Sequence, residues 1–135
     1  MANEAVIIEL LGNQGDPIRY TVADGTGIEK GTLLCLSSDP RTVSASSAEG
    51  QIFVGIAAEE KTASDGITEI SVYQNGIFDL KDSSAGMTLG DICKLGGANL
   101  VATADETGAL ANQEVVGIVL ETAAASEVVA VRINK

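Results

Sequence analysis

Three acidic residues, Glu59, Glu60 and Asp65, have a spacing that could support chemistry, either as a calcium site or as a glycosidase pair. Calcium loops place oxygen ligands at alternate positions around a glycine, and the chain contains no DxDxDG pattern. Asp24-Gly25 and Asp65-Gly66 have the composition of tight turns. These carboxylates therefore predict turns and a solvated face rather than an active site.

Serine and cysteine nucleophiles lack a base in this sequence. The chain has no histidine, which is the commonest general base and the commonest transition-metal ligand. A serine would need a lysine base, and no SxxK pattern occurs. Cys35 and Cys93 form no CxxC motif and stand in short aliphatic runs, which predicts buried thiols, with a disulfide or a reactive thiol as the alternative. We expect no catalytic residue, no cofactor and no metal, and hence no enzyme.

The composition of the 135 residues weighs against several binding functions. With 19 acidic and 8 basic residues the net charge is -11, so a nucleic-acid backbone would be repelled. No apolar run reaches the roughly 20 residues of a membrane span, and the N-terminus lacks the pattern of a signal peptide. We expect one soluble, unexported domain over residues 1–135, with no nucleic-acid or membrane partner. The aromatic residues are too few for a platform that stacks bases or sugars: Tyr20, Phe53, Tyr73 and Phe78.

Short aliphatic runs separated by glycine-containing turns predict an all-β fold with little helix. The Asn75-Gly76 pair between two such runs predicts a two-residue hairpin turn. Helix is expected at 105–112, where Asp105 would be the N-cap, with 44–50 as a second candidate. The predicted strands are 5–11, 18–23, 33–37, 52–59, 67–74, 76–80, 92–95, 100–103, 115–121 and 128–134.

An internal repeat organises these strands. The Gly-x-x-x-Gly turn and strand that begin at Gly27 recur at Gly86, 59 positions later. Val54-Gly55-Ile56 recurs 62 positions later as Val116-Gly117-Ile118, and 70–75 aligns with 129–134. Within a strand, a glycine such as Gly55 or Gly117 marks a bulge or a close backbone approach. The repeat predicts a compact β-barrel or sandwich with two similar lobes, 24–80 and 81–135, after an arm and first strands at 1–23.

Several stretches resemble the head decoration proteins of tailed bacteriophages, which are also called capsid-stabilising or cement proteins. The resemblance covers nearly the whole chain, and its motifs are aliphatic and glycine-rich rather than chemically unique. It is carried by GNQGDPIRYTVA at 12–23, IEKGTLL at 28–34, VGIAAEEK at 54–61 and ISVYQNGIFDL at 70–80.

This resemblance implies a small β-rich fold, of the β-tulip type in the lambda-like members, that assembles as homotrimers. It implies docking on the outside of an expanded icosahedral shell at three-fold or quasi-three-fold positions, where the family clamps neighbouring major capsid proteins against internal DNA pressure. The implied partners are the major capsid protein and further copies of this chain. The implied locations are the capsid exterior of the virion and, during assembly, the host cytoplasm.

Two other classes of function remain open from the sequence. One is a particle-displayed binding module for a host-surface glycan or protein, although the scarcity of aromatic residues counts against a glycan site. The other is a small β-barrel enzyme or ligand-binding domain, which the missing histidine opposes.

The N-terminal arm is the candidate capsid contact. In related decoration proteins this arm often adds a strand to the capsid sheet. The alternative interpretation is a first strand that packs in the protein's own core or in a trimer interface. The matching aliphatic residues of this chain are Val6, Ile7, Ile8, Leu10 and Leu11.

Overall fold

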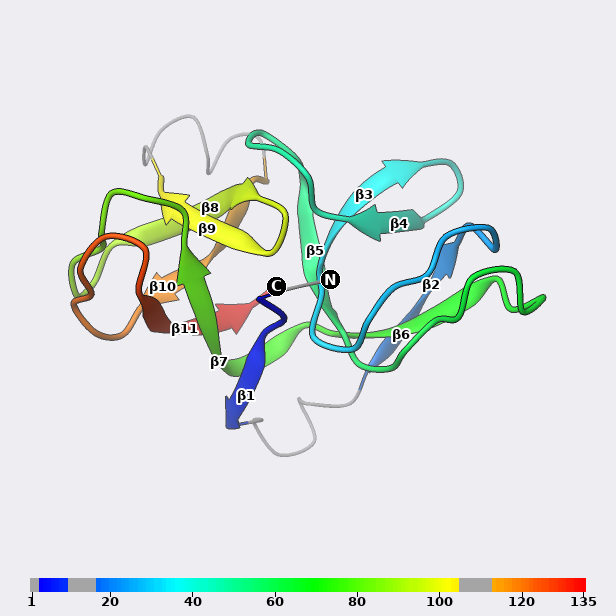
Figure 1. The fold of residues 1–135 in the computed structure, drawn as a ribbon, viewed down its shortest axis with the longest axis horizontal. Helices are drawn as coiled ribbons and strands as arrows, with labels where there is room; N and C mark the ends of the chain where they lie inside the picture. Colours follow the sequence, from blue (N-terminus) through cyan, green and yellow to red (C-terminus); the bar gives the residue numbers. More distant parts are fainter. Residues whose placement is uncertain (1–2, 10–16, 105–112) are drawn as a thin grey trace.

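The computed structural model describes residues 3–9, 17–104 and 113–135, and these residues form strands and turns without helix (Figure 1). The all-β class predicted from the sequence is confirmed. The strands are β1 (Val6–Glu9), β2 (Ile18–Val22), β3 (Leu33–Ser38), β4 (Thr42–Ala45), β5 (Phe53–Ala57), β6 (Glu69–Tyr73), β7 (Asn75–Asp82), β8 (Ile92–Gly97), β9 (Leu100–Thr103), β10 (Val115–Val119) and β11 (Val128–Asn134).

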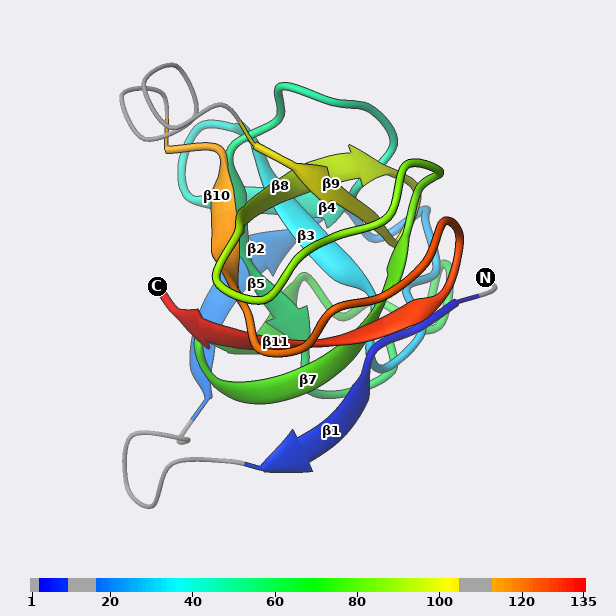
Figure 2. The ribbon, with the colours of Figure 1, turned by 90° about the vertical axis from the view of Figure 1, so that its left-hand side faces the viewer.

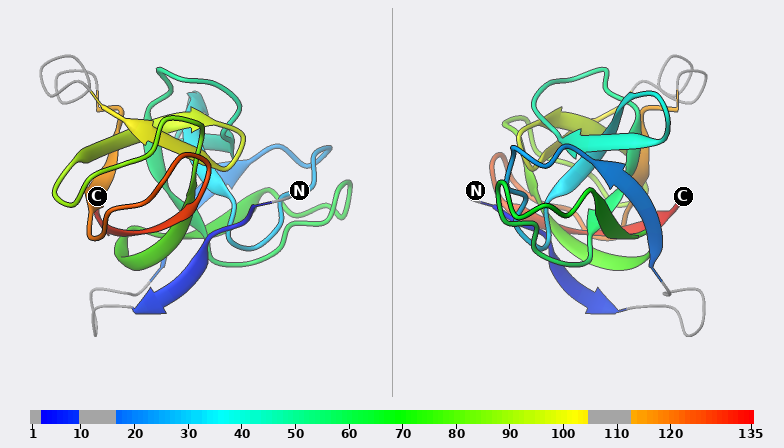
Figure 3. Two further views of the ribbon diagram at one scale, coloured as in Figure 1. Left: turned by 60° about the vertical axis from the view of Figure 1, so that its left-hand side comes forward. Right: turned by 90° about the vertical axis from the view of Figure 1, so that its right-hand side faces the viewer.

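The strands close two five-stranded barrels. Barrel one has the order β2-β4-β3-β5-β6, and barrel two has the order β7-β11-β10-β8-β9, which closes through parallel pairing of β7 with β9. Strand β1 pairs with β7 at the edge of barrel two. Barrel two comes forward in the left-hand view of Figure 3, and barrel one faces the viewer in the right-hand view.

The two barrels are the repeated lobes expected from the sequence. Each has one parallel pairing, between β2 and β4 in barrel one and between β7 and β9 in barrel two, and its other pairings are antiparallel in the same order. Even the isolated bridges recur, because Ile28 pairs with Lys61 and Met87 pairs with Ala123. The expected lobe boundary between residues 80 and 81 falls inside β7, and all of β7 belongs to barrel two.

The prediction of a hairpin turn at Asn75-Gly76 is wrong. Strand β6 ends at Tyr73 and β7 begins at Asn75, and the two strands belong to different barrels. Asn75 pairs with Asn134 and Gly76 with Ile133 of β11, so the pair extends a strand that crosses from one barrel to the next. The preference of Asn-Gly for turns is local, and it carries no information about pairing with a strand that is distant in the sequence.

The prediction of helix at 44–50 is also wrong, because β4 covers Thr42–Ala45 and Glu49 forms a bridge with Gly96. Two edges of barrel one, on β2 and β3, pair with β4 and draw this segment into a strand. The helix expected at 105–112 lies outside the described residues.

The hydrophobic core has two clusters that follow the barrels. The first fills barrel one and includes Leu34, Val54 and Ile70. The second fills barrel two with residues such as Phe78 and Leu95, and it continues into side chains on the outer face of β3 and β5 of barrel one. We call this outer face wall one, and its residues in the second cluster are Leu33, Cys35, Phe53 and Ile56. The packing of wall one against barrel two joins the repeats into one body.

Gly55 and Gly117 lie at equivalent positions and have the close approach predicted for them. A Cβ on Gly55 would lie 2.3 Å from the carbonyl oxygen of Tyr73, and one on Gly117 would lie 2.1 Å from that of Arg132. The ladder shifts register beside each glycine, which is the signature of a bulge. Both cysteines are buried and form no disulfide, which agrees with the prediction of buried thiols.

Candidate functional site

The N-terminal segment spans both barrels. The amide of Ala5 donates a hydrogen bond of 2.6 Å to the carbonyl oxygen of Gly31 in barrel one. Beyond Ala5, strand β1 pairs antiparallel with β7 of barrel two, and Figure 2 shows it beside β7 at the margin of the barrel. The segment is thus fixed by main-chain hydrogen bonds at two points.

Gly31 provides the space that the N-terminal segment occupies. Its φ is 91°, and a Cβ there would lie 2.8 Å from the carbonyl oxygen of Ala5 and 2.9 Å from the Cβ of Glu4. The equivalent glycine of barrel two, Gly90, also has a positive φ but has nothing within 4 Å of such an atom. The sequence predicted only a turn at Gly31, because the neighbour that requires glycine comes from a distant part of the chain.

Three of the predicted arm residues are exposed aliphatic side chains of β1. Val6 is 57% exposed, Ile7 36% and Ile8 54%. The register of β1 on β7 shifts between Ile7 and Glu9, so that Ile8 lies in a bulge. Neither core cluster contains these side chains, although Ala5 packs against the core of barrel two. Leu10 and Leu11, the other predicted contacts, lie outside the described residues.

Strand β1 leaves one edge of its main chain open. Among the described residues it pairs with β7 and with no other strand. An edge strand presents unpaired N–H and C=O groups to which another strand can bond. The open edge of β1 can therefore accept a strand from another chain. In such strand addition, main-chain hydrogen bonds supply affinity and alternate side chains supply selectivity.

The carboxylates of Glu59 and Asp65 do not converge on one site. Hydrogen bonding from the side chain of Ser71, and from its main-chain amide at 2.9 Å, lowers the pKa of the Glu59 carboxyl. Asp65 and Asp24 instead contact the buried ammonium of Lys61 at 2.7 and 3.0 Å. Burial disfavours the charge on Lys61, but the hydrogen bonds that its ammonium donates to Asp65 and Asp24 outweigh this effect, and the pKa of Lys61 is raised. This cluster closes the turns at one end of barrel one, and no local pattern in the sequence indicates that Lys61 is buried.

In the described part of the chain, no group of three or more cysteine or acidic side chains is placed to hold a metal ion. Over the same ranges, no helix has the length and apolar character needed to cross a membrane.

Comparison with known proteins gives a family and a fold. The family model of phage cement proteins matches residues 12–133. The crystal structure of the N base of the head fiber gp8.5 of bacteriophage phi29 is similar in fold, with a TM-score of 0.55 and 17% sequence identity. The similarity covers 87% of this chain and 92% of that one. No curated protein matches this chain in sequence. Because the family model spans most of the chain, the chain belongs to the phage cement protein family.

Proposed function

We propose that this structural phage protein binds the outer surface of a tailed-phage capsid and stabilises the shell against internal DNA pressure. In this proposal it docks as a homotrimer at three-fold positions, on the major capsid protein. It reaches the capsid exterior from the host cytoplasm during assembly. Membership of the cement protein family supports a capsid-associated structural role.

The observation that carries the docking proposal is the state of β1. This strand is held in place by β7, yet it has one open edge and exposed aliphatic side chains at Val6 and Ile8. A free strand of the capsid protein that adds to this edge would satisfy the open main-chain groups and cover the side chains. Because Ala5 and Glu4 contact Gly31, the strand is ordered before it docks, which lowers the entropy cost of binding.

The experiment compares two variants in binding to expanded shells. Ile8→Asp places a carboxylate in the proposed contact, and we expect binding to weaken by roughly tenfold or more, because a buried unpaired charge is costly. Val128→Asp is the matched control, since Val128 is 56% exposed on barrel two outside β1, and we expect it to bind as the wild type does.

Cosedimentation with shells measures binding, and circular dichroism shows whether each variant is folded. Equal binding by folded Ile8→Asp and wild type would exclude the β1 edge as the docking site. Failure of the wild type to bind expanded shells of its own phage would contradict the capsid role as a whole.

A further inference from the structure

At one end, equivalent in the two barrels, the aliphatic and aromatic side chains are exposed in barrel one and buried in barrel two. We call this end the mouth: β3 ends there in barrel one, and β8 ends there in barrel two. Ile18 and Leu36 at the mouth of barrel one are 46% and 44% exposed. Their equivalents by strand register in barrel two, Phe78 and Leu95, are both 0% exposed.

The mouth of barrel two is covered by barrel one. Wall one packs into the barrel-two core, and the ring of Tyr73 from β6 lies 6.1 Å from that of Phe78. At the β8–β9 turn, the side-chain oxygen of Asn99 accepts a hydrogen bond of 2.9 Å from the amide of Leu33 in wall one. Figure 1 shows this turn directed at barrel one, whereas the equivalent β3–β4 turn points away from barrel two.

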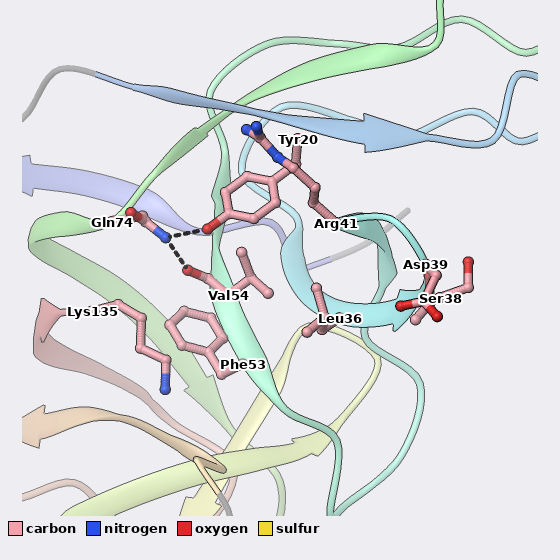
Figure 4. A pocket seen from close by; sticks show the side chains of 10 residues that line it. Tyr20, Leu36, Ser38, Asp39, Arg41, Phe53, Val54, Gln74 and Lys135 are labelled. Carbon is pink, nitrogen blue, oxygen red and sulfur yellow. Dashed lines mark hydrogen bonds between the residues drawn. The ribbon is translucent and has the colours of Figure 1, made fainter.

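The mouth of barrel one holds an open cavity of about 670 Å³ (Figure 4). Its apolar lining includes Tyr20, Leu36, Phe53 and Val54. The side-chain amide of Gln74 donates to the hydroxyl of Tyr20 at 2.9 Å and to the carbonyl oxygen of Val54 at 3.2 Å. These polar groups bond to one another, and the larger part of the lining surface is apolar. The lining is completed by Ser37, Ser38, Asp39, Arg41 and Lys135.

Barrel two has an exposed counterpart of wall one. The residues equivalent to Leu33, Phe53 and Ile56 are Ile92, Val115 and Ile118, and we call this outer face of β8 and β10 wall two. Ile118 is 50% exposed, while its equivalent Ile56 is 1% exposed. Ile92, Val115 and Ile118 line a depression of about 440 Å³.

We propose that the mouth of barrel one in one copy of this chain receives wall two of another copy. The chain already makes this type of contact internally, between the mouth of barrel two and wall one. The mouth of barrel one and wall two stay exposed, and together they could form one further contact of this type. Every copy of the chain carries both surfaces, so the mouth of one copy can receive wall two of the next.

This contact joins different surfaces of the two copies, so repetition gives a closed ring or an open filament. The inference deepens the proposed function, because it names the contact that would join the copies of the proposed trimer. Lys94 of wall two stands where wall one has Cys35, and Arg132 stands where β6 has Tyr73. Lys94 is already paired with Glu49 at 3.4 Å. We therefore expect a weaker contact than the internal one, formed at high concentration or on the shell.

The first test weakens each half of the contact separately. We expect Leu36→Asp in the mouth and Ile118→Asp in wall two each to reduce self-association by about tenfold or more, since either buries an unpaired carboxylate. Ile67→Asp is the control, because Ile67 is 54% exposed and precedes β6 at the opposite end of barrel one from the mouth. Sedimentation equilibrium over a wide concentration range measures association, and circular dichroism confirms folding.

The second test identifies which surfaces meet. Leu36→Cys and Ile118→Cys chains are mixed and treated with a short bis-maleimide, while the native cysteines stay unreactive because they are buried. We expect a cross-linked dimer from the mixture and none from either variant alone. Cross-linking of Leu36→Cys alone at the yield of the mixture would show that two mouths meet, and it would overturn the proposal.

The remaining outcomes separate this inference from the proposed function. A wild-type chain that stays monomeric both at high concentration and on shells would overturn the mouth-to-wall contact. So would Leu36→Asp if it associates normally but no longer binds shells, because the mouth would then be covered by the capsid protein. In both cases wild-type binding to shells would leave the capsid-binding role standing, although a wild-type chain that is monomeric on shells would remove the homotrimer from the proposed function.

Discussion

Barrel one and barrel two share strand order, bulge positions and the glycine at the centre of β5 and β10. They differ in whether another part of the chain covers the mouth. Barrel two is covered at its mouth by barrel one, and its interior contains Phe78 and Leu95 fully buried. Barrel one has an open mouth with Ile18 and Leu36 exposed. The repeat thus specifies the barrel, and the neighbour of each barrel determines whether an aliphatic position becomes core or surface.

The buried charges of the two barrels differ as well. Barrel one buries Lys61 between two aspartates, and barrel two has Ala123 at the equivalent position. Barrel two instead buries Asp82, whose carboxylate accepts hydrogen bonds from the amides of Gly86 and Ser126 at 2.7 and 3.0 Å. Each barrel thus secures its turns at the end opposite the mouth with a different buried side chain.

The largest expected effect tests what the barrels share. Gly55→Val and Gly117→Val each place a side chain inside the van der Waals distance of a neighbouring main-chain oxygen, at 2.3 and 2.1 Å. Because backbone on a paired strand cannot yield, we expect each variant to lose about 4 kcal/mol or more of stability, or to fail to fold. Urea unfolding measures the loss.

Gly25→Ala is the control for these substitutions. Nothing lies within 4 Å of a Cβ on Gly25, and its φ is not in the left-handed region, so we expect a change of less than about 1 kcal/mol. A mild effect at Gly117 beside a severe one at Gly55 would show that the two barrels do not depend on this approach equally.

The next prediction concerns the contact that makes the barrels unequal. Asn99→Ala removes the acceptor for the buried amide of Leu33 and so weakens the seal between the mouth of barrel two and wall one. We expect a loss of about 1–3 kcal/mol, the usual cost of an unsatisfied buried group. Asp39→Ala, in the exposed β3–β4 turn of barrel one, should change stability little. Thermal unfolding of both variants would contradict this account if their losses were equal.

The parts of this fold that the sequence predicted are those encoded by local pattern and repetition. The spacing of Gly27 and Gly86, and of Gly55 and Gly117, identified two lobes without any structure. The burial of Lys61 could not be predicted, because Glu59-Glu60-Lys61 has the composition of a solvated turn and its partner Asp24 is distant in the chain. Strand β4 was missed for a similar reason, since Thr42–Ala45 is short and gains its order from two neighbouring strands.

The candidate site, like the fold, was predictable from the sequence only in part. The aliphatic run at Val6, Ile7 and Ile8 predicted an arm, and the exposure of these residues agrees with a surface that another chain could cover. Its contact with capsid protein stays a prediction. The exposed mouth of barrel one could not be seen in the sequence, because Leu36 and Leu95 occupy the same place in the repeat and differ only in what packs on them.

A smaller effect is expected from acid. The hydrogen bond from Lys61 lowers the pKa of Asp65, so the ionised carboxylate stabilises the fold above its ordinary pKa. This contribution is lost as the pH falls below about 4 and through the lowered pKa. Lys61→Met keeps the aliphatic stem but removes the ammonium, and we expect its urea midpoint to depend less on pH between about pH 5 and about pH 2. Parallel pH profiles of variant and wild type would contradict a role for this ion pair in acid stability.

The smallest effect is a difference in labelling rate between the two thiols. Burial raises the pKa of the Cys93 thiol to about 12, and both thiols are buried in the native protein. We therefore expect almost no reaction with a thiol reagent at neutral pH in the absence of denaturant, because the thiolate is the nucleophile and is inaccessible. Cys35 belongs to wall one, whereas Cys93 lies in the interior of barrel two.

Separation of the barrels would expose Cys35 without opening barrel two, whereas Cys93 reacts only when barrel two itself opens. In mild urea we therefore expect Cys35 to be labelled before Cys93, as mass spectrometry of the labelled peptides would show. Asn99→Ala should widen the difference, since it weakens the contact between the barrels and leaves the strand pairings of barrel two in place. Equal rates at both thiols, in wild type and variant, would mean that the barrels open as one cooperative unit. In that case the mouth of barrel two could not become exposed while barrel two stays folded, and the two mouths would differ in this respect as well.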